Sequence, residues 1–192
     1  MAQPVTPSPV KLLCGMISAD RRLFDKAVEH LTDAFGPVDL ASDVLAFDLT
    51  HYYDDEMGSP LYKQFVSFTE LTPADSLLRA KLTTNAIEAD FSAMVKTHPR
   101  PINLDPGYIE PSKLVLASMK NFSHRIYLGS GVYAEITLQY RQGRWCKLPW
   151  TFPDFASGRY DAFLSAVRDL LPHGKPNPNN AGPSADPLET QS

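Results

Sequence analysis

A β-hairpin pattern in the C-terminal half most constrains what this chain can fold into. Apolar and polar residues alternate over His124–Leu128 and again over Val132–Tyr140. Such alternation is typical of strands that bury one face, here the face that carries Ile126 and Leu128. The intervening Gly129-Ser130-Gly131 permits the positive φ angles of a three-residue hairpin loop. The predicted antiparallel register places Leu128 opposite Val132, Tyr127 opposite Tyr133, and Arg125 opposite Glu135.

The segments before this hairpin alternate between strand and helix patterns. Apolar residues recur every three or four positions over Asp20–Phe35, and Gly36-Pro37 is a helix stop. A second helix begins at Thr72-Pro73 and runs to about Ala93. This order predicts an α+β fold with a ferredoxin-like βαββαβ core, in which both helices pack on one face of an antiparallel sheet. The inner stripe of the second helix is predicted as Leu78, Leu82, Ala86 and Ala89, and the four core strands as Val10–Ser18, Val44–Leu49, Gln64–Leu71 and Pro101–Leu104.

The C-terminal third is predicted to extend this sheet by β-hairpins and to end in a helix. Lys113–Ser118 is a short apolar strand, and a further hairpin turns at Gln142-Gly143. Proline breaks Pro149–Pro153, which we expect to cover the core as an aromatic lid. The last helix is predicted over Gly158–Leu171. The domain organisation is then a flexible N-terminus at 1–9, a single α+β domain at 10–172, and a disordered C-terminal tail at 173–192.

Composition and charge favour a cytoplasmic protein. No run approaches the roughly 18 apolar residues of a membrane span, and the N-terminus lacks the pattern of a signal peptide. A net charge of −4 gives no general attraction to nucleic acid or to an anionic membrane. Cys14 and Cys146 lie in apolar strand-like contexts and are predicted as buried free thiols of a reducing compartment. A chain of this length needs no cofactor in order to fold, and the sequence assigns none.

Charge is distributed unevenly along the chain. Residues 38–62 contain six acids and no lysine or arginine, whereas residues 111–147 contain six cations and one acid, Glu135. The asymmetry is typical either of internal complementarity or of a site with an anionic and a cationic pole.

Four phrases of the sequence resemble a known family. They are FDLTHYYDDEMGSPLYKQFVSF, INLDPGYIEPSKLVLAS, HRIYLGSGVYAEITL and LPWTFPDF, and they occur in this order within Val10–Leu171. Together they resemble the bacterial domain-of-unknown-function family numbered 4416. The resemblance implies no activity and no catalytic residue.

The candidate catalytic residues are four side chains able to exchange a proton. Asp48 and Glu56 flank an acidic segment that also holds His51, and such a segment can supply acid–base groups or oxygen ligands for a divalent ion. No known metal-ligand motif is matched, so no metal site is assigned, and a solvated acidic loop is the alternative. The four candidates are Asp48, Glu56, Asp105 and His124.

The candidate ligand-binding residues fall in two groups. Asn103, Asp105 and Tyr108 alternate at a strand end, although Asp105-Pro106-Gly107 is equally typical of a turn. Lys113, Lys120, His124 and Arg125 can hold a phosphate or carboxylate, whereas Arg125 and Glu135 can also form a plain cross-strand ion pair. Tyr127, Tyr133, Trp150 and Phe152 can stack on a planar ring or belong to the core, and Asn85 is a polar residue near the second helix's inner stripe. The predicted ligand-binding set is Asn103, Tyr108, Lys113, Lys120, Arg125, Tyr127 and Glu135.

Three functions are consistent with these patterns. The first is a binding protein or enzyme for a small anionic metabolite, bearing a phosphate or nucleotide, in a pocket between Asp48–Glu56 and the cations of 113–125. The second is an RNA-binding module that uses the tyrosines and cations of the hairpins. The third is a protein-interaction scaffold without catalysis. A convergent polar pocket would support the first, and a broad basic sheet face the second.

Overall fold

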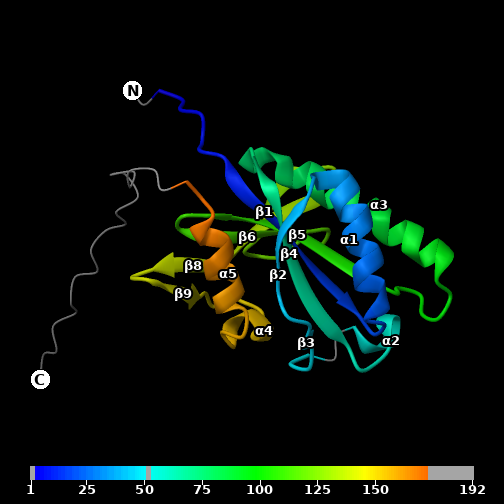
Figure 1. Ribbon diagram of the computed structural model, residues 1–192. Coiled ribbons are helices and arrows are strands. Elements are labelled where there is room, and N and C mark those ends of the chain that lie inside the picture. Colours follow the sequence, from blue (N-terminus) through cyan, green and yellow to red (C-terminus); the bar gives the residue numbers. More distant parts are fainter. Residues whose placement is uncertain (1–2, 51–52, 173–192) are drawn as a thin grey trace, which may run out of the picture.

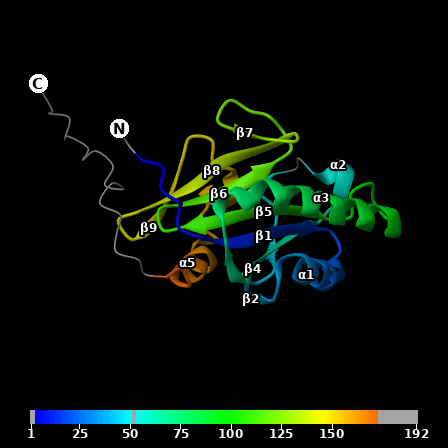
Figure 2. The same cartoon turned by 90° about the horizontal axis from the view of Figure 1, so that it is seen from above.

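Nine strands in the described part of the chain form one antiparallel sheet (Figure 1). The structure is a computed structural model that describes residues 3–50 and 53–172. The strands are β1 (Val10–Ser18), β2 (Val38–Ala41), β3 (Leu45–Ala46), β4 (Tyr62–Thr72), β5 (Asn103–Glu110), β6 (Lys113–Ser118), β7 (Ile126–Gly129), β8 (Val132–Arg141) and β9 (Arg144–Lys147). Their order is β2-β4-β1-β5-β6-β8-β7, with β3 paired to β4 and β9 paired to β8. Figure 2 shows β7 and β8 at the opposite end of the sheet from β2 and β4.

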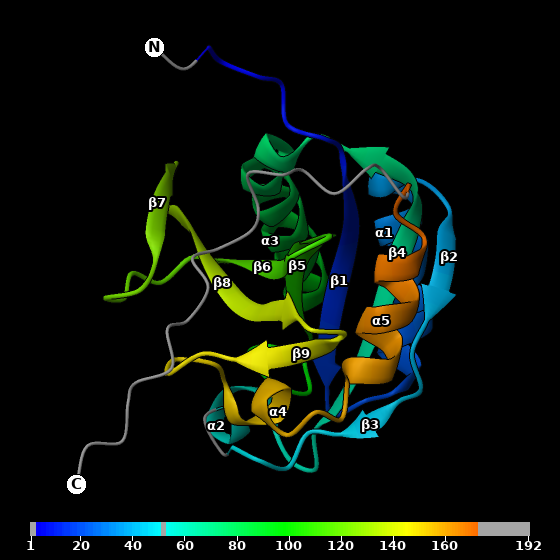
Figure 3. The ribbon, with the colours of Figure 1, turned by 90° about the vertical axis from the view of Figure 1, so that its left-hand side faces the viewer.

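Helices cover both faces of the sheet. The long helices α1 (Arg22–Phe35) and α3 (Leu77–Met94) lie behind the strands in Figure 3, whereas α4 (Pro153–Ala156) and α5 (Asp161–Asp169) lie in front. A 3₁₀ turn at Ala74–Ser76 leads into α3, and the short α2 (Asp54–Met57) follows β3. The predicted α+β class with a large antiparallel sheet is confirmed.

The core consists of two main apolar layers separated by β1. Leu12, Cys14 and Met16 point toward α1 and α3, whereas Leu13 packs with Phe65 on the side of α5. All nine residues of β1 are buried, which explains its nearly continuous apolar run. Cys14 is a buried free thiol as predicted, but Cys146 is a free thiol that is partly exposed on β9.

Two predicted strands differ from those observed, and one observed strand was not predicted. Only Leu45–Ala46 of the predicted Val44–Leu49 forms a strand, and the edge strand β2 was missed because it is short and half exposed. The strand predicted at Pro101–Leu104 instead runs from Asn103 to Glu110 and includes the Asp105-Pro106-Gly107 segment that was also interpreted as a turn. Proline has no N–H to donate to a neighbouring strand. Pro106 is tolerated because it pairs only with β1, while β6 pairs with β5 only from Gly107 onward.

The predicted hairpin forms, but its loop and its buried face were wrong. Tyr127 lies opposite Tyr133 as predicted, whereas Gly129 and not Leu128 lies opposite Val132, because the register shifts between Tyr127 and Gly129. Ser130 and Gly131 make the turn, both with positive φ. Ile126 is 69% exposed, and it lies on β7, the last strand of the sheet.

Helix α3 also buries a different stripe from the one predicted. Leu82 is 40% exposed, and the buried side chains include the charged Lys81 and Glu88. The buried apolar residues of α3 are Leu77, Ala80, Ile87 and Phe91, and none of them belongs to the predicted stripe.

The ends of the chain carry no regular structure where they are described. Residues 3–9 are exposed and form no helix or strand. Residues 1–2 and the predicted tail at 173–192 lie outside the described residues. Within 3–50 and 53–172, none of the helices combines the length and the apolar character needed to cross a membrane.

Candidate functional site

A cavity lies where β5 and β6 separate. β5 pairs with β1 from Asn103 onward, but it pairs with β6 only from Gly107 to Glu110. Gly107 is needed at the junction, because a Cβ there would lie 2.4 Å from Leu116 Cδ2 and 2.5 Å from the Val115 carbonyl oxygen. Beyond the junction the two strands leave room for a cavity of about 540 Å³.

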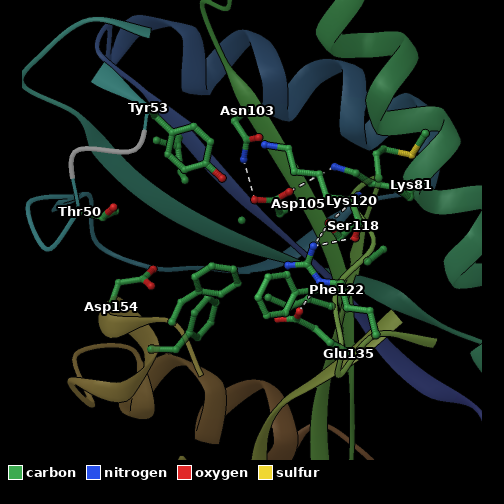
Figure 4. Close-up of a pocket in the computed structure, with 18 of the residues that line it drawn as sticks. Thr50, Tyr53, Lys81, Asn103, Asp105, Ser118, Lys120, Phe122, Glu135 and Asp154 are labelled. Atoms are coloured by element: carbon green, nitrogen blue, oxygen red, sulfur yellow. Dashed lines mark hydrogen bonds and ion pairs between the residues drawn. The ribbon is translucent and has the colours of Figure 1, made fainter. Parts of the chain in front are cut away.

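Segments far apart in the sequence line this cavity. They include β1, β4, α3, β5, β6, β8, the segment between β3 and α2, the β6–β7 loop and the segment that leads into α4. In Figure 4, Tyr53, Asn103 and Asp105 lie on one side of the cavity, and Asp154, Phe122 and Glu135 lie on the other. The lining includes five cationic side chains, which are Lys63, Lys81, Arg100, Lys120 and Arg125. It includes three carboxylates, which are Asp105, Glu135 and Asp154.

Charged residues of α3 satisfy the backbone of β5 at the separation. The Leu104 N–H donates to Glu88 Oε1 at 2.7 Å, and the Leu104 carbonyl accepts from Lys81 Nζ at 2.8 Å. A strand normally satisfies these groups through its neighbour, and buried backbone groups without partners are costly. Lys81 and Glu88 therefore replace the missing β6 partner at this position.

The same helix holds Asp105 at the cavity wall. Lys81 Nζ lies 3.2 Å from Asp105 Oδ1, and Asn103 Nδ2 donates to Asp105 Oδ2 at 2.6 Å. Burial opposes the charged form of Asp105, but Lys81 and the Asn103 amide outweigh it and lower the pKa of this carboxyl. The side chain is 31% exposed. Asp105 is thus an ionised group that is held in place and accessible from the cavity.

Arg100 joins this network to α2. Its Nη2 donates to Glu88 Oε2 at 3.0 Å and also to the Asn103 side-chain oxygen, and its Nη1 lies 3.8 Å from Glu56 Oε2. Burial raises the pKa of Glu88, although the charges of Lys81 and Arg100 oppose that rise.

A second cluster is centred on the buried Glu135 of β8. Its Oε2 accepts from Arg125 Nε at 2.7 Å and lies 2.9 Å from His124 Nε2. Arg125 Nη1 donates to Ser118 Oγ at 2.8 Å and to the Lys120 carbonyl oxygen at 2.7 Å. Because Glu135 is only 4% exposed, this is a buried cluster that fixes the β6–β7 loop, and not a surface ion pair.

A third cluster pairs Lys63 of β4 with Asp154 of α4. Lys63 Nζ donates to Asp154 Oδ2 at 2.7 Å, and the Tyr160 hydroxyl donates to the same oxygen at 3.2 Å. Burial raises the pKa of Tyr160, with the Asp154 charge adding to the rise. Four aromatic rings surround the Lys63 ammonium within 5.3 Å of their centroids, and they belong to Phe47, Phe65, Phe155 and Tyr160.

The structure brings together six of the predicted site residues. They line one cavity and are Asn103, Asp105, Lys120, His124, Arg125 and Glu135. Arg125 and Glu135 form the predicted cross-strand ion pair within this lining.

The other predicted site residues lie outside the cavity lining. Asp48 pairs with Arg159 at 2.9 Å, and the Glu56 side chain is 63% exposed. Lys113 pairs with Glu110, Tyr108 packs with Val115 and Ala117 near α3, and Tyr127 contacts Tyr133 at the sheet edge. The expectation that Asp48 and Glu56 face Lys113 across a shared pocket was therefore wrong. Their segment contributes Thr50 and Tyr53 instead, and His51 lies outside the described residues.

Sequence reasoning missed four charged residues of the lining. Lys63, Lys81, Arg100 and Asp154 carry no motif, and charged side chains are rarely buried, so none of them was among the predicted site residues. For Lys81 a signal existed, because it lies four residues after the apolar Leu77 and therefore on the same face of α3.

We expect Asp105→Asn to reduce the loss of stability at acid pH. Because the pKa of Asp105 is lowered in the folded protein, its ionised form stabilises the fold above the usual carboxyl range, and this contribution disappears as the pH falls from about 5 toward 2. Urea unfolding at pH 7 and pH 3 should show a smaller difference for Asp105→Asn than for the wild type. The exposed Asp33→Asn serves as control, and equal differences for all three proteins would contradict the prediction.

The fold is an α+β fold with a large antiparallel sheet, and its cavity is lined by five lysine or arginine side chains and three carboxylates. The chain belongs to the family described as Domain of unknown function (DUF4416), whose model matches residues 8–170. A search of curated proteins found no match. A search of solved structures found none either.

Proposed function

We propose that the protein binds a small anionic metabolite, bearing a phosphate or carboxylate, in the cavity between β5 and β6. The observation that carries this proposal is the excess of positive charge in the lining, five lysine or arginine side chains against three carboxylates, in a chain of net charge −4. Each carboxylate already has a cationic partner, in Lys81, Arg125 and Lys63 respectively. Arg100 is also paired, with Glu88 of α3, but Glu88 does not line the cavity, so the lining itself carries more positive than negative side chains. This balance favours a ligand that brings its own negative charge.

The size and construction of the cavity also support a small ligand. Its volume of about 540 Å³ lies within the range of roughly 300–1,000 Å³ that is usual for small-molecule sites. The polar groups are held by hydrogen bonds before any ligand arrives, which lowers the entropic cost of binding. Among the carboxylates of the lining, Asp105 is the most accessible from the cavity, because its side chain is 31% exposed whereas those of Asp154 and Glu135 are 5% and 2% exposed.

The arrangement supports this function over RNA binding. An RNA module of the kind considered above reads bases on an open sheet face. Here α1 and α3 cover one face of the central strands and α5 covers the other.

We further propose that the core is ferredoxin-like. Four neighbouring strands follow the order β2-β4-β1-β5, with α1 after β1 and α3 after β4. This order, antiparallel throughout, supports the βαββαβ arrangement, to which β6, β7, β8 and β9 would then be additions.

Lys120→Ala is expected to weaken anion binding about tenfold, because a charge-assisted hydrogen bond contributes about 1.5–3 kcal/mol. Titration calorimetry with AMP and with inorganic phosphate at fixed ionic strength measures the effect. Lys113→Ala is the matched control, because Lys113 pairs with Glu110 and does not line the cavity. Equal losses in the two variants, or no binding of either anion to the wild type, would contradict the proposal.

A further inference from the structure

Large aromatic side chains stand exposed at the edge of the cavity. Phe122 is 64% exposed, Phe152 45% and Trp150 38%, and all three line the cavity. They come from two separate segments, the β6–β7 loop and the residues between β9 and α4. Leaving such rings in water forgoes the roughly 1.5–3 kcal/mol that burying a large apolar side chain contributes. A ligand that covers them would recover part of this free energy.

Two of these rings belong to a wall that is fixed before a ligand binds. Trp150 Nε1 donates to the Ile136 carbonyl oxygen at 2.8 Å, and its ring is stacked on His124, with centroids 5.2 Å apart and an interplanar angle of 9°. Phe122 contacts the same imidazole, with centroids 5.3 Å apart. Because Glu135 holds His124, the wall is attached to the core of the sheet.

This aromatic wall adjoins the cationic part of the lining. Phe122 lies between Lys120 and Arg125 in the β6–β7 loop, and all three line the cavity. Phe152 lies two residues before Asp154, which is bound to Lys63. A flat ring packed on the wall would therefore place an attached negative group next to cations.

We infer that the anion bound in this cavity carries a planar ring, which packs against Phe122 and Phe152. The ligand class is thus a nucleotide or an aromatic acid, and not a sugar phosphate or a free inorganic anion. This inference rests on the proposed function. The proposed function names the anionic group of the ligand, and the inference adds a planar ring. Phe122 and Phe152 are specificity-determining residues, because a π face distinguishes planar ligands from others of equal charge.

Calorimetric titration with four probes tests the inference: AMP, benzoate, ribose 5-phosphate and inorganic phosphate, at one ionic strength. We expect AMP, benzoate or both to bind at least tenfold more tightly than ribose 5-phosphate. Phe122→Leu and Phe152→Leu keep an apolar side chain but remove the π face, and each should weaken binding of the ring-bearing probe about tenfold while leaving ribose 5-phosphate unchanged. Tyr127→Leu is the matched control, since this exposed ring lies outside the cavity lining.

The outcomes separate the two proposals. Equal affinity for AMP, benzoate and ribose 5-phosphate, or unchanged binding of the ring-bearing probes to Phe122→Leu and Phe152→Leu, overturns the ring inference and leaves anion binding intact. No binding of any probe to the wild type overturns both. AMP favoured over benzoate assigns the nucleotide class, and the reverse assigns the aromatic acid.

Discussion

Asp154→Ala should destabilise the folded protein by about 3–5 kcal/mol, because it leaves the Lys63 ammonium buried without its carboxylate. Both side chains are only 5% exposed. Asp154 accepts hydrogen bonds from Lys63 and from the Tyr160 hydroxyl, and the aromatic rings around Lys63 cannot replace this acceptor. The free energy of unfolding at pH 7, from urea titration followed by circular dichroism, measures the effect.

A second variant separates loss of the charge pair from loss of packing. Replacing both partners, in Lys63→Met/Asp154→Leu, should recover most of the lost stability, because an apolar pair of similar volume avoids the cost of burying charge. The partly exposed pair of Lys113 and Glu110 provides the matched control, and Glu110→Ala should cost about 1 kcal/mol or less. If Asp154→Ala costs no more than Glu110→Ala, the pair is not buried in solution as described.

Lys81→Met should be comparably destabilising, by about 3–5 kcal/mol. This single change removes the partner of Asp105, and it also removes the donor to the Leu104 carbonyl that no neighbouring strand satisfies. Methionine keeps most of the volume, so packing alone does not explain a large effect. Urea unfolding at pH 7 again measures the change.

Lys26→Met on α1 is the control for Lys81→Met, since Lys26 is exposed and a surface substitution usually alters stability by less than about 0.5 kcal/mol. A loss at Lys81 that is as small as the loss at Lys26 would show that β5 does not depend on α3 for its backbone hydrogen bonds.

These two effects have a common structural origin. The cavity exists because β5 separates from β6, and a separation inside a sheet exposes polar backbone that must find other partners. Lys81 and Glu88 reach β5 from one side of the sheet, and Lys63 and Asp154 close the other side. The charged residues of the site are thus also structural residues of the fold, so tests of binding need variants at its edge, such as Lys120 and Phe122.

Local pattern predicted the regular elements well where one face or both faces are apolar. β1 and β6 have the predicted bounds, Tyr127 lies opposite Tyr133, and the helix predicted after Thr72-Pro73 forms. The predictions were wrong where the position of a residue in the folded sheet outweighed the local pattern of apolar and polar residues. Ile126 has the alternation of a buried strand but lies exposed on an edge strand, and Lys81 is buried where it donates to the backbone of β5.

The sequence by itself determined the α+β class, the antiparallel hairpins and the concentration of cations in residues 111–147, because each depends on residues close together in the chain. Only the tertiary structure decided which charges share the cavity. Asn103, Asp105, Lys120, His124, Arg125 and Glu135 meet there, while Asp48, Glu56 and Lys113 do not. The reason is physical: a buried charge is stable only beside its partner, and the partners Lys63 with Asp154, and Lys81 with Asp105, are brought together by the order of the strands and not by their spacing in the sequence.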